Sequence, residues 1–348
     1  DMVCSEMSED ILYVTDGNYV YKSVNGGMSF MIVAENSLEI LLLGDCGDAF
    51  TIDDTPITCL DVGYNATGDS FVFIGVTYTW VDGIVTPTDY PSVLYINEAG
   101  YPSEWTDLNL SCFHAITGVP GGYTPYSIGC APDFATSKKT YVAVTNDADV
   151  DITGAHTYII STVGIVCGWD EVDELFWDCD AVTPNNFEIM HASRFAFPDD
   201  FADTGAMFIG VTAWNGTTTN TAGGDVYSAY DTVPQAQDAL DLNVQGFTSG
   251  CEGLADANIC SLDMYGGTDD GSLIAGAYDG YDVLYGGSGT NVWYSTDGGW
   301  TWSASAKDPT GVDLTYVIWY ADTALAGTNG CNCAISMSCG DVVGQYWN

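Results

Sequence analysis

The chain has 348 residues, five Lys and Arg against 48 Asp and Glu, and a formal net charge of −43 at pH 7. Five basic side chains are too few to form the clusters that bind phosphate groups. Nucleic acid is therefore excluded as a partner. No apolar run approaches the roughly 20 residues that a membrane-spanning helix requires.

Hydrophobic residues make up 47% of the chain, with 40 Gly, 22 Tyr and many Thr and Val. This composition favours strands joined by tight turns, and a single large all-β domain fits the length. The chain opens at Asp1 without a basic, apolar leader, so we expect a mature, extracellular protein whose signal segment has been removed.

A half-unit recurs along the chain: a strand, a polar turn with Asp or Gly, then an apolar strand. Copies occur at 5–16, 60–77, 130–145, 195–212, 262–278 and 317–329. Aligned on the ends of their second strands, the copies are separated by roughly 50 to 70 residues, the length of a four-stranded propeller blade with its loops.

A second half with a hairpin turn follows each copy. These halves lie at 21–30, 94–105, 158–169, 226–235, 293–302 and 334–348. Six first halves, each followed by a second half, predict one propeller of six four-stranded blades. Seven blades are the alternative, if one of the six segments contains two short blades. The expected blades are approximately 1–45, 46–111, 112–180, 181–250, 251–310 and 311–348.

Two of these hairpins carry the pattern Ser-x-Asp-x-Gly-x-Thr-Trp or a looser form of it. The full copy has Ser295, Asp297, Gly299, Thr301 and Trp302, and the looser copy has Ser23, Asn25, Gly27, Ser29 and Phe30. Asp or Asn can bond the backbone of a tight turn, glycine supplies positive φ, and the final aromatic is expected to pack over the hairpin.

This pattern resembles the Asp-box (BNR) repeat of sialidase-like β-propellers. In that family the box is a fold device on the blade rim and takes no part in catalysis. The resemblance therefore implies a propeller and leaves the activity open.

The twelve cysteines form an even set without the spacing of a zinc cluster, which favours disulfides in an oxidising compartment. We expect sequential bonds that staple the blades, with Cys4 latching the ring through one member of the last group while the other two pair. The pairs are Cys46–Cys59, Cys112–Cys130, Cys167–Cys179 and Cys251–Cys260, and the last group is Cys331, Cys333 and Cys339.

Repulsion among so many negative charges would destabilise a compact fold unless the charges are spread out, screened by salt or neutralised by bound cations. Asp147, Asp149 and Asp151 follow a predicted strand at alternate positions, so their carboxylates could converge on calcium. The loop lacks the glycine and glutamate of an EF-hand, and a solvated loop is the alternative. No organic cofactor is expected.

Three tripeptides match the N-glycosylation pattern, at Asn65, Asn109 and Asn215. Such tripeptides also arise by chance. A glycoprotein is therefore an expectation that depends on the source cell.

Sialidases of the resembling superfamily clamp the substrate carboxylate with three arginines, whereas this chain has one, Arg194. Propellers of that kind that cleave neutral glucans use paired carboxylates, but 48 acidic residues make any nomination uninformative. The histidines are scattered, and four tryptophans could stack on sugars or pack between blades. They are His114, His156 and His191, and Trp80, Trp105, Trp214 and Trp319.

With no catalytic signature found, we expect a secreted, non-enzymatic structural protein, a surface-layer or filament subunit whose partner is itself. The alternative is a carbohydrate-binding or glycoside-hydrolase propeller module with glycan partners.

Overall fold

A computed structural model describes the parts of the chain from which the fold is read. These are residues 1–5, 7–34, 57–80, 88–100, 103–110, 123–146, 156–163, 168–175, 188–214, 224–231, 239–242, 244, 258–277, 292–306, 309, 315–320, 323–328 and 345–347. They form two compact units, Asp1–Val150 with Tyr158–Glu171, and Asp151–Thr157 with Val172–Asn348. None of the helices among these residues is long and apolar enough to cross a bilayer.

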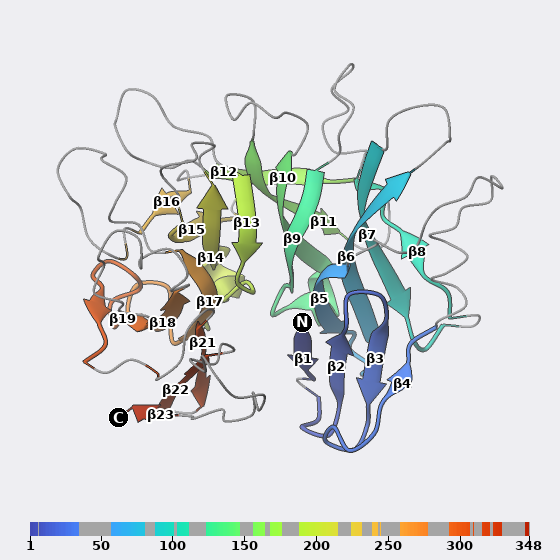
Figure 1. Cartoon of the computed structure of the whole chain (residues 1–348), viewed down its shortest axis with the longest axis horizontal. Helices are drawn as coiled ribbons and strands as arrows, with labels where there is room; N and C mark the ends of the chain where they lie inside the picture. The colour runs from blue at the N-terminus through green and yellow to red at the C-terminus, as the bar shows by residue number, and fades with distance from the viewer. Residues whose placement is uncertain are drawn as a thin grey trace, which may run out of the picture. The chain divides into compact units, whose positions relative to one another are not determined.

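Two complete sheets of the first unit are meanders in which consecutive strands are hydrogen-bonded neighbours (Figure 1). Their strands are β1 Met2–Cys4, β2 Leu12–Thr15, β3 Val20–Ser23 and β4 Met31–Ile32, then β5 Ile57–Tyr64, β6 Ser70–Trp80, β7 Thr88–Asn97 and β8 Thr106–Asp107. A third sheet has β9 Tyr123–Cys130, β10 Lys139–Asn146, β11 Thr157–Val163 and β12 Asp170–Leu175, the last of which runs on into the second unit.

The second unit repeats the same meander. Its strands are β13 Glu188–Ala192, β14 Ala206–Trp214, β15 Val226–Tyr230 and β16 Leu240–Asp241, then β17 Ile259–Tyr265, β18 Ser272–Ala277, β19 Val292–Ser295 and β20 Ser303–Ala304, and finally β21 Thr315–Tyr320, β22 Thr323–Thr328 and β23 Gln345–Trp347. Two one-turn helices, α2 Phe134–Ser137 and α3 Phe201–Thr204, lie between the first and second strands of their sheets.

The chain thus has the all-β fold of a propeller, built from successive four-stranded meanders. Five sheets have four strands, fewer than the six or seven complete blades expected from the repeats. The sixth sheet has three strands in the described part of the chain, because only Gln345–Trp347 follows β22 there. Each sheet lies inside one of the six segments read from the repeats; their assembly into a single domain stays a prediction.

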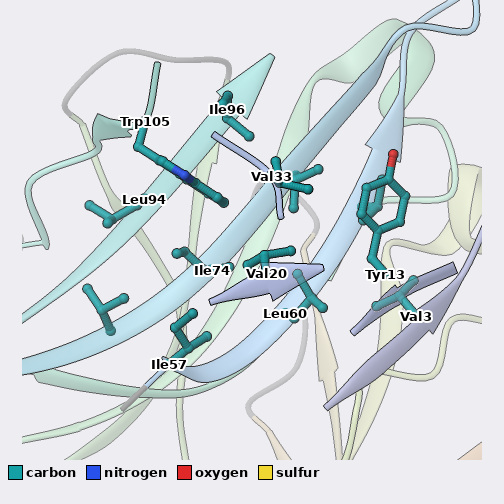
Figure 2. Close-up of a cluster of buried hydrophobic side chains, with 13 residues drawn as sticks. Val3, Tyr13, Val20, Val33, Ile57, Leu60, Ile74, Leu94, Ile96 and Trp105 are labelled. Carbon is teal, nitrogen blue, oxygen red and sulfur yellow. The ribbon is translucent and has the colours of Figure 1, made fainter. Parts of the chain in front are cut away.

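Hydrophobic side chains from successive sheets form the core of the first unit. In Figure 2, Val20 of the first sheet lies between Ile74 and Leu60 of the second, with Tyr13 and Leu94 on opposite sides of the same cluster. All five are at most 1% exposed. Face-to-face packing of this kind explains the alternation of apolar residues along the strands.

Small residues occupy the second strand where the next sheet's first strand crosses it. A Cβ added at Gly210 would lie 2.2 Å from Cγ2 of Ile259, and one added at Gly75 would lie 2.9 Å from Cβ of Pro125. The repeat therefore keeps glycine at this position because two strands approach each other too closely for a side chain.

Half-buried carboxylates also tie neighbouring first strands together. Asp61 on β5 accepts a hydrogen bond from the Cys130 amide at 2.7 Å, and Asp263 on β17 accepts one from the Trp319 amide at 2.7 Å. Burial raises the pKa of Asp263 despite its hydrogen bonds to the amides of Trp319 and Met264. These aspartates are structural links between blades. The comparison of the sequence repeats did not single them out.

Candidate functional site

The two ends of each sheet differ in the connections that they carry. Because neighbouring strands run in opposite directions, the first-to-second and third-to-fourth connections leave from one end, called here the turn end. The second-to-third connections and the links to the next sheet leave from the other, called the loop end. Loop-end connections include 33–56, 81–87, 108–122, 147–156, 215–225, 242–258 and 278–291.

Internal hydrogen bonds fix the turn end, and both copies of the Ser-x-Asp-x-Gly pattern form the same hairpin turn. Asp297 Oδ1 accepts the Ser295 hydroxyl at 2.8 Å and the Thr301 amide at 2.9 Å. Asn25 Oδ1 accepts the Ser23 hydroxyl and the Ser29 amide, both at 2.9 Å. The equivalence of Asn25 and Asp297 shows that the pattern needs a carbonyl-type oxygen at this position and no negative charge.

The final aromatic of each copy differs in burial. Trp302 packs against the core cluster of the second unit, as expected. Phe30 is 46% exposed, although its ring edge lies beside Gly27, 3.9 Å from where a Cβ would stand.

We expect Asp297→Asn to keep the turn, since the Thr301 hydroxyl can reverse its role and accept from the new amide as Ser29 does from Asn25 at 2.8 Å. Asp297→Ala removes three hydrogen bonds and should cost about 1–2 kcal/mol of unfolding free energy at pH 7. Chemical denaturation at pH 7 compares the three proteins. Equal stability of the Asn and Ala variants would contradict this role of the side chain.

The same variants predict a pH dependence. Burial slightly opposes the charge of Asp297, but hydrogen bonds from Thr301 and Ser295 outweigh it and lower the pKa of this carboxyl. Its stabilisation is complete above the unfolded pKa of about 3.9 and is lost as the pH falls through the lower folded value. The wild type should therefore lose stability relative to Asp297→Asn only at acidic pH, below about pH 4.

A β-bulge recurs in the first strand of four sheets, toward the loop end. The pairing skips one residue between Ile57 and Cys59 in β5, and likewise in β9, β13 and β17. In the first unit the bulged Thr58 donates to the Pro125 carbonyl at 2.5 Å. Bulges re-aim side chains and are frequent beside active sites, so the loop end is the candidate functional region of each unit.

In the second unit, His191 and Cys260 meet at this bulge without forming a catalytic pair. The His191 ring nitrogen Nε2 donates to the Cys260 carbonyl at 3.2 Å, and burial lowers the pKa of this histidine. The Cys260 thiol contacts the carbonyls of Gly276 and Thr315, and burial raises the pKa of the thiol to about 12. As a free thiol Cys260 is protonated at neutral pH and is no nucleophile, whereas the predicted bond to Cys251 would remove the thiol altogether.

Carboxylates at the loop end of the second unit hold the chain in place. Asp225 is 1% exposed and accepts the amides of Val226 at 2.7 Å and Val244 at 3.0 Å. Glu174 and His156 form a partly exposed pair, with Oε1 and Nδ1 2.5 Å apart. Of Asp225 and Glu174, only Glu174 is partly exposed and within hydrogen-bond distance of another titratable group, His156. The described ranges bring no three metal-ligating side chains together.

Several predicted site residues lie outside the described ranges. They are Asp147, Asp149 and Asp151, His114, Asn215, and Cys46, Cys112, Cys167, Cys179, Cys251, Cys331, Cys333 and Cys339. Cys4 is exposed and Cys59 and Cys260 are buried, but the expected partner of each described cysteine is among these residues. Calcium binding and the disulfide scheme both stay predictions.

The remaining predicted residues have structural surroundings. Asn65 closes a turn by accepting the amides of Thr67 and Asp69, and Asn109 is exposed. Trp105 is 4% exposed in the first core and so is not available to a sugar, whereas Trp319 is partly buried against the last core cluster. Glycosylation of the described asparagines stays a prediction.

No protein-family model matches the sequence, and no curated protein matches it either. Among solved structures, a Trypanosoma rangeli sialidase bound to the inhibitor DANA aligns with 94% of this chain at 9% identity and a TM-score of 0.49. The alignment covers 51% of the sialidase, so this chain spans about half of that protein.

Two further neighbours are an arabinofuranosidase and a protein of unknown function. The GH93 α-L-arabinofuranosidase of Fusarium graminearum aligns over 93% of this chain and 86% of its own, at 10% identity and a TM-score of 0.46. A protein of unknown function from Dyadobacter fermentans aligns over 78% and 74%, at 13% identity and a TM-score of 0.43. Identities this low concern the fold alone.

These neighbours correct the expectation that the chain is no enzyme. Their names show that propellers of similar fold include glycoside hydrolases. The expectation rested on missing local motifs, and a hydrolase whose carboxylates are brought together by the fold need carry none. No observation supports the surface-layer or filament subunit or the homo-oligomer.

Proposed function

We propose that this chain is an extracellular glycan-recognising module of the glycoside-hydrolase type, which holds a neutral glycan at the loop end. The observation that carries the proposal is the difference between the two ends of the sheets. Hydrogen-bonded turns close one end, whereas long connections leave the other, where loops on a rigid scaffold commonly carry binding residues.

The chemistry of the loop-end connections supports a sugar ligand. Residues 278–291 contain Tyr278, Tyr281 and Tyr285 among glycines, and 215–225 is rich in Thr and Asn. Aromatic rings can stack on the apolar face of a sugar, and hydroxyl, amide and carboxylate groups can bond its hydroxyls.

Charge selects the class of glycan. Four of the five basic residues, Lys22, Lys138, Lys139 and Arg194, lie outside the loop-end connections, which hold only Lys307. A chain with net charge −43 repels polyuronates and sialylated glycans, so the ligand is neutral. Hydrolysis would use a pair of the abundant carboxylates, one as acid and one as nucleophile or base.

Affinity electrophoresis and reducing-end release test this function together. Linear arabinan and β-1,3-glucan represent neutral polysaccharides, and polygalacturonate and polysialic acid serve as charged controls of similar length. We expect retardation by at least one neutral polymer, with release of reducing ends from it, and none by either polyanion. Retardation by the polyanions alone, or by no polymer, would contradict the proposal.

A further inference from the structure

The hairpin turn 295–302 of the fifth sheet, called here the Trp300 turn, presents a large aromatic side chain to solvent. Trp300 is 67% exposed, while Trp302 of the same turn packs into the core. Met28 stands at the same position of the first-sheet turn and is 87% exposed. Both turns thus project an apolar side chain that the core does not need.

The Trp300 turn is held rigidly. The Gly299 amide donates to the Ser295 hydroxyl at 2.9 Å, and the Gly298 amide donates to the Gly271 carbonyl at 3.0 Å. A Cβ at Gly298 would lie 2.1 Å from the Thr268 carbonyl oxygen, so the turn rests directly on the neighbouring loop 266–271. An aromatic side chain on a fixed backbone loses less conformational entropy on binding a ligand than one on a flexible loop.

The surroundings of Trp300 suit a polyol better than an apolar protein surface. Asp269 and Asp270, on the loop beneath the turn, are exposed carboxylates, and the turn itself contributes Thr296, Asp297 and Thr301. The Met28 hairpin instead exposes further apolar residues, namely Val24, Phe30, Met31 and Ile32. A protein-docking patch needs such contiguous apolar area. The exposed large side chain directly before the Trp300 turn is Tyr294, whose hydroxyl can bond a sugar.

We propose that the Trp300 turn is a second glycan contact, at the turn end of the fifth sheet and therefore separate from the loop end. The indole takes the flat apolar face of a neutral sugar ring, and the carboxylates of Asp269 and Asp270 accept its hydroxyls. This contact rests on the proposed function and deepens it, because it lets the module hold a long chain at two points.

Binding of polymer and of oligomer by Trp300→Ala tests the proposal. The probes are linear arabinan and β-1,3-glucan, each with its own trisaccharide, which is too short to reach both ends of a sheet. We expect Trp300→Ala to lose about ten-fold in affinity for the bound polymer and to keep its affinity for the trisaccharide. Trp300→Phe should restore most of the polymer affinity, and Met28→Ala, the matched control, should leave both affinities unchanged.

The outcomes separate the two proposals. If the wild type binds a polymer and Trp300→Ala binds it with the same affinity, the second contact is overturned and the proposed function stands. A wild-type protein that binds neither polymer overturns the proposed function and the second contact with it. A variant that changes sedimentation behaviour and keeps its polymer affinity assigns Trp300 to a protein contact, which also overturns the proposal.

Discussion

Gly276→Ala is expected to destabilise the second unit by about 3 kcal/mol, near the upper end of the usual cost of overpacking. A Cβ at this position of β18 would lie 2.0 Å from the carbonyl oxygen of Thr315 and 2.9 Å from its carbonyl carbon. Because both atoms belong to the backbone of β21, relief requires the fifth and sixth sheets to move apart.

Urea denaturation of the purified variants measures this cost. Gly168→Ala is the matched control, since a Cβ there would meet no atom within 4 Å. Ala143 already occupies the corresponding position of the third sheet, so the strand itself tolerates a methyl group there, and the cost at Gly276 comes from the close approach of Thr315. Equal midpoints for Gly276→Ala and Gly168→Ala would show that the strand crossing is looser than the structure indicates.

The second large effect is expected at Glu98, which joins the first two sheets of the first unit. Its Oε2 accepts from the Tyr13 hydroxyl at 2.5 Å and from the Lys22 ammonium at 2.7 Å, and it also accepts from the Ser70 hydroxyl. The Lys22 ammonium lies 5.1 Å from the centre of the Tyr13 ring. Burial, followed by the contact with Glu98, raises the pKa of Tyr13, so its hydroxyl remains a donor.

Glu98→Ala leaves a fully buried tyrosine hydroxyl and a largely buried ammonium without this acceptor. Breaking a buried ion pair costs about 3–5 kcal/mol, and the side chains of Lys22 and Glu98 are still 18% and 20% exposed. We therefore expect about 2–3 kcal/mol for Glu98→Ala. Glu98→Gln keeps an acceptor oxygen and should cost about 1 kcal/mol.

A double-mutant cycle with Lys22→Met isolates the ionic part of this cluster. Lys22→Met removes the charge and keeps the apolar stem over the Tyr13 ring. Glu98→Ala should then cost less in the Lys22→Met background than in the wild type. Equal costs in the two backgrounds would show that the ion pair adds nothing to the junction.

The sequence predicted most of the fold because its repeats are local. Ser295 and Asp297 supply hydrogen bonds and Gly299 a backbone angle within a single turn, so spacing alone predicts that turn. The one-turn helices were not anticipated, although Phe134 and Phe201 occupy equivalent places in two repeats and are buried.

Interactions between distant residues could not be predicted in this way. Glu98 meets Tyr13 and Lys22 across 85 and 76 residues, and no local pattern marks any of the three. The same reasoning explains the wrong expectation of a non-enzymatic chain. A glycosidase requires two carboxylates that the fold brings together, and among 48 acidic residues no spacing distinguishes such a pair.

Hydrogen exchange measured by mass spectrometry tests most directly whether the loop end holds the glycan. The measurement uses the Trp300→Ala protein, because this variant lacks the second contact. Exchange is compared with and without the trisaccharide of the neutral polymer that the protein binds. If the loop end holds the glycan, exchange will be slower in peptides that cover loop-end connections such as 81–87, 147–156, 215–225 or 278–291. Slower exchange confined to turn-end peptides such as 24–30 and 266–271 would contradict it.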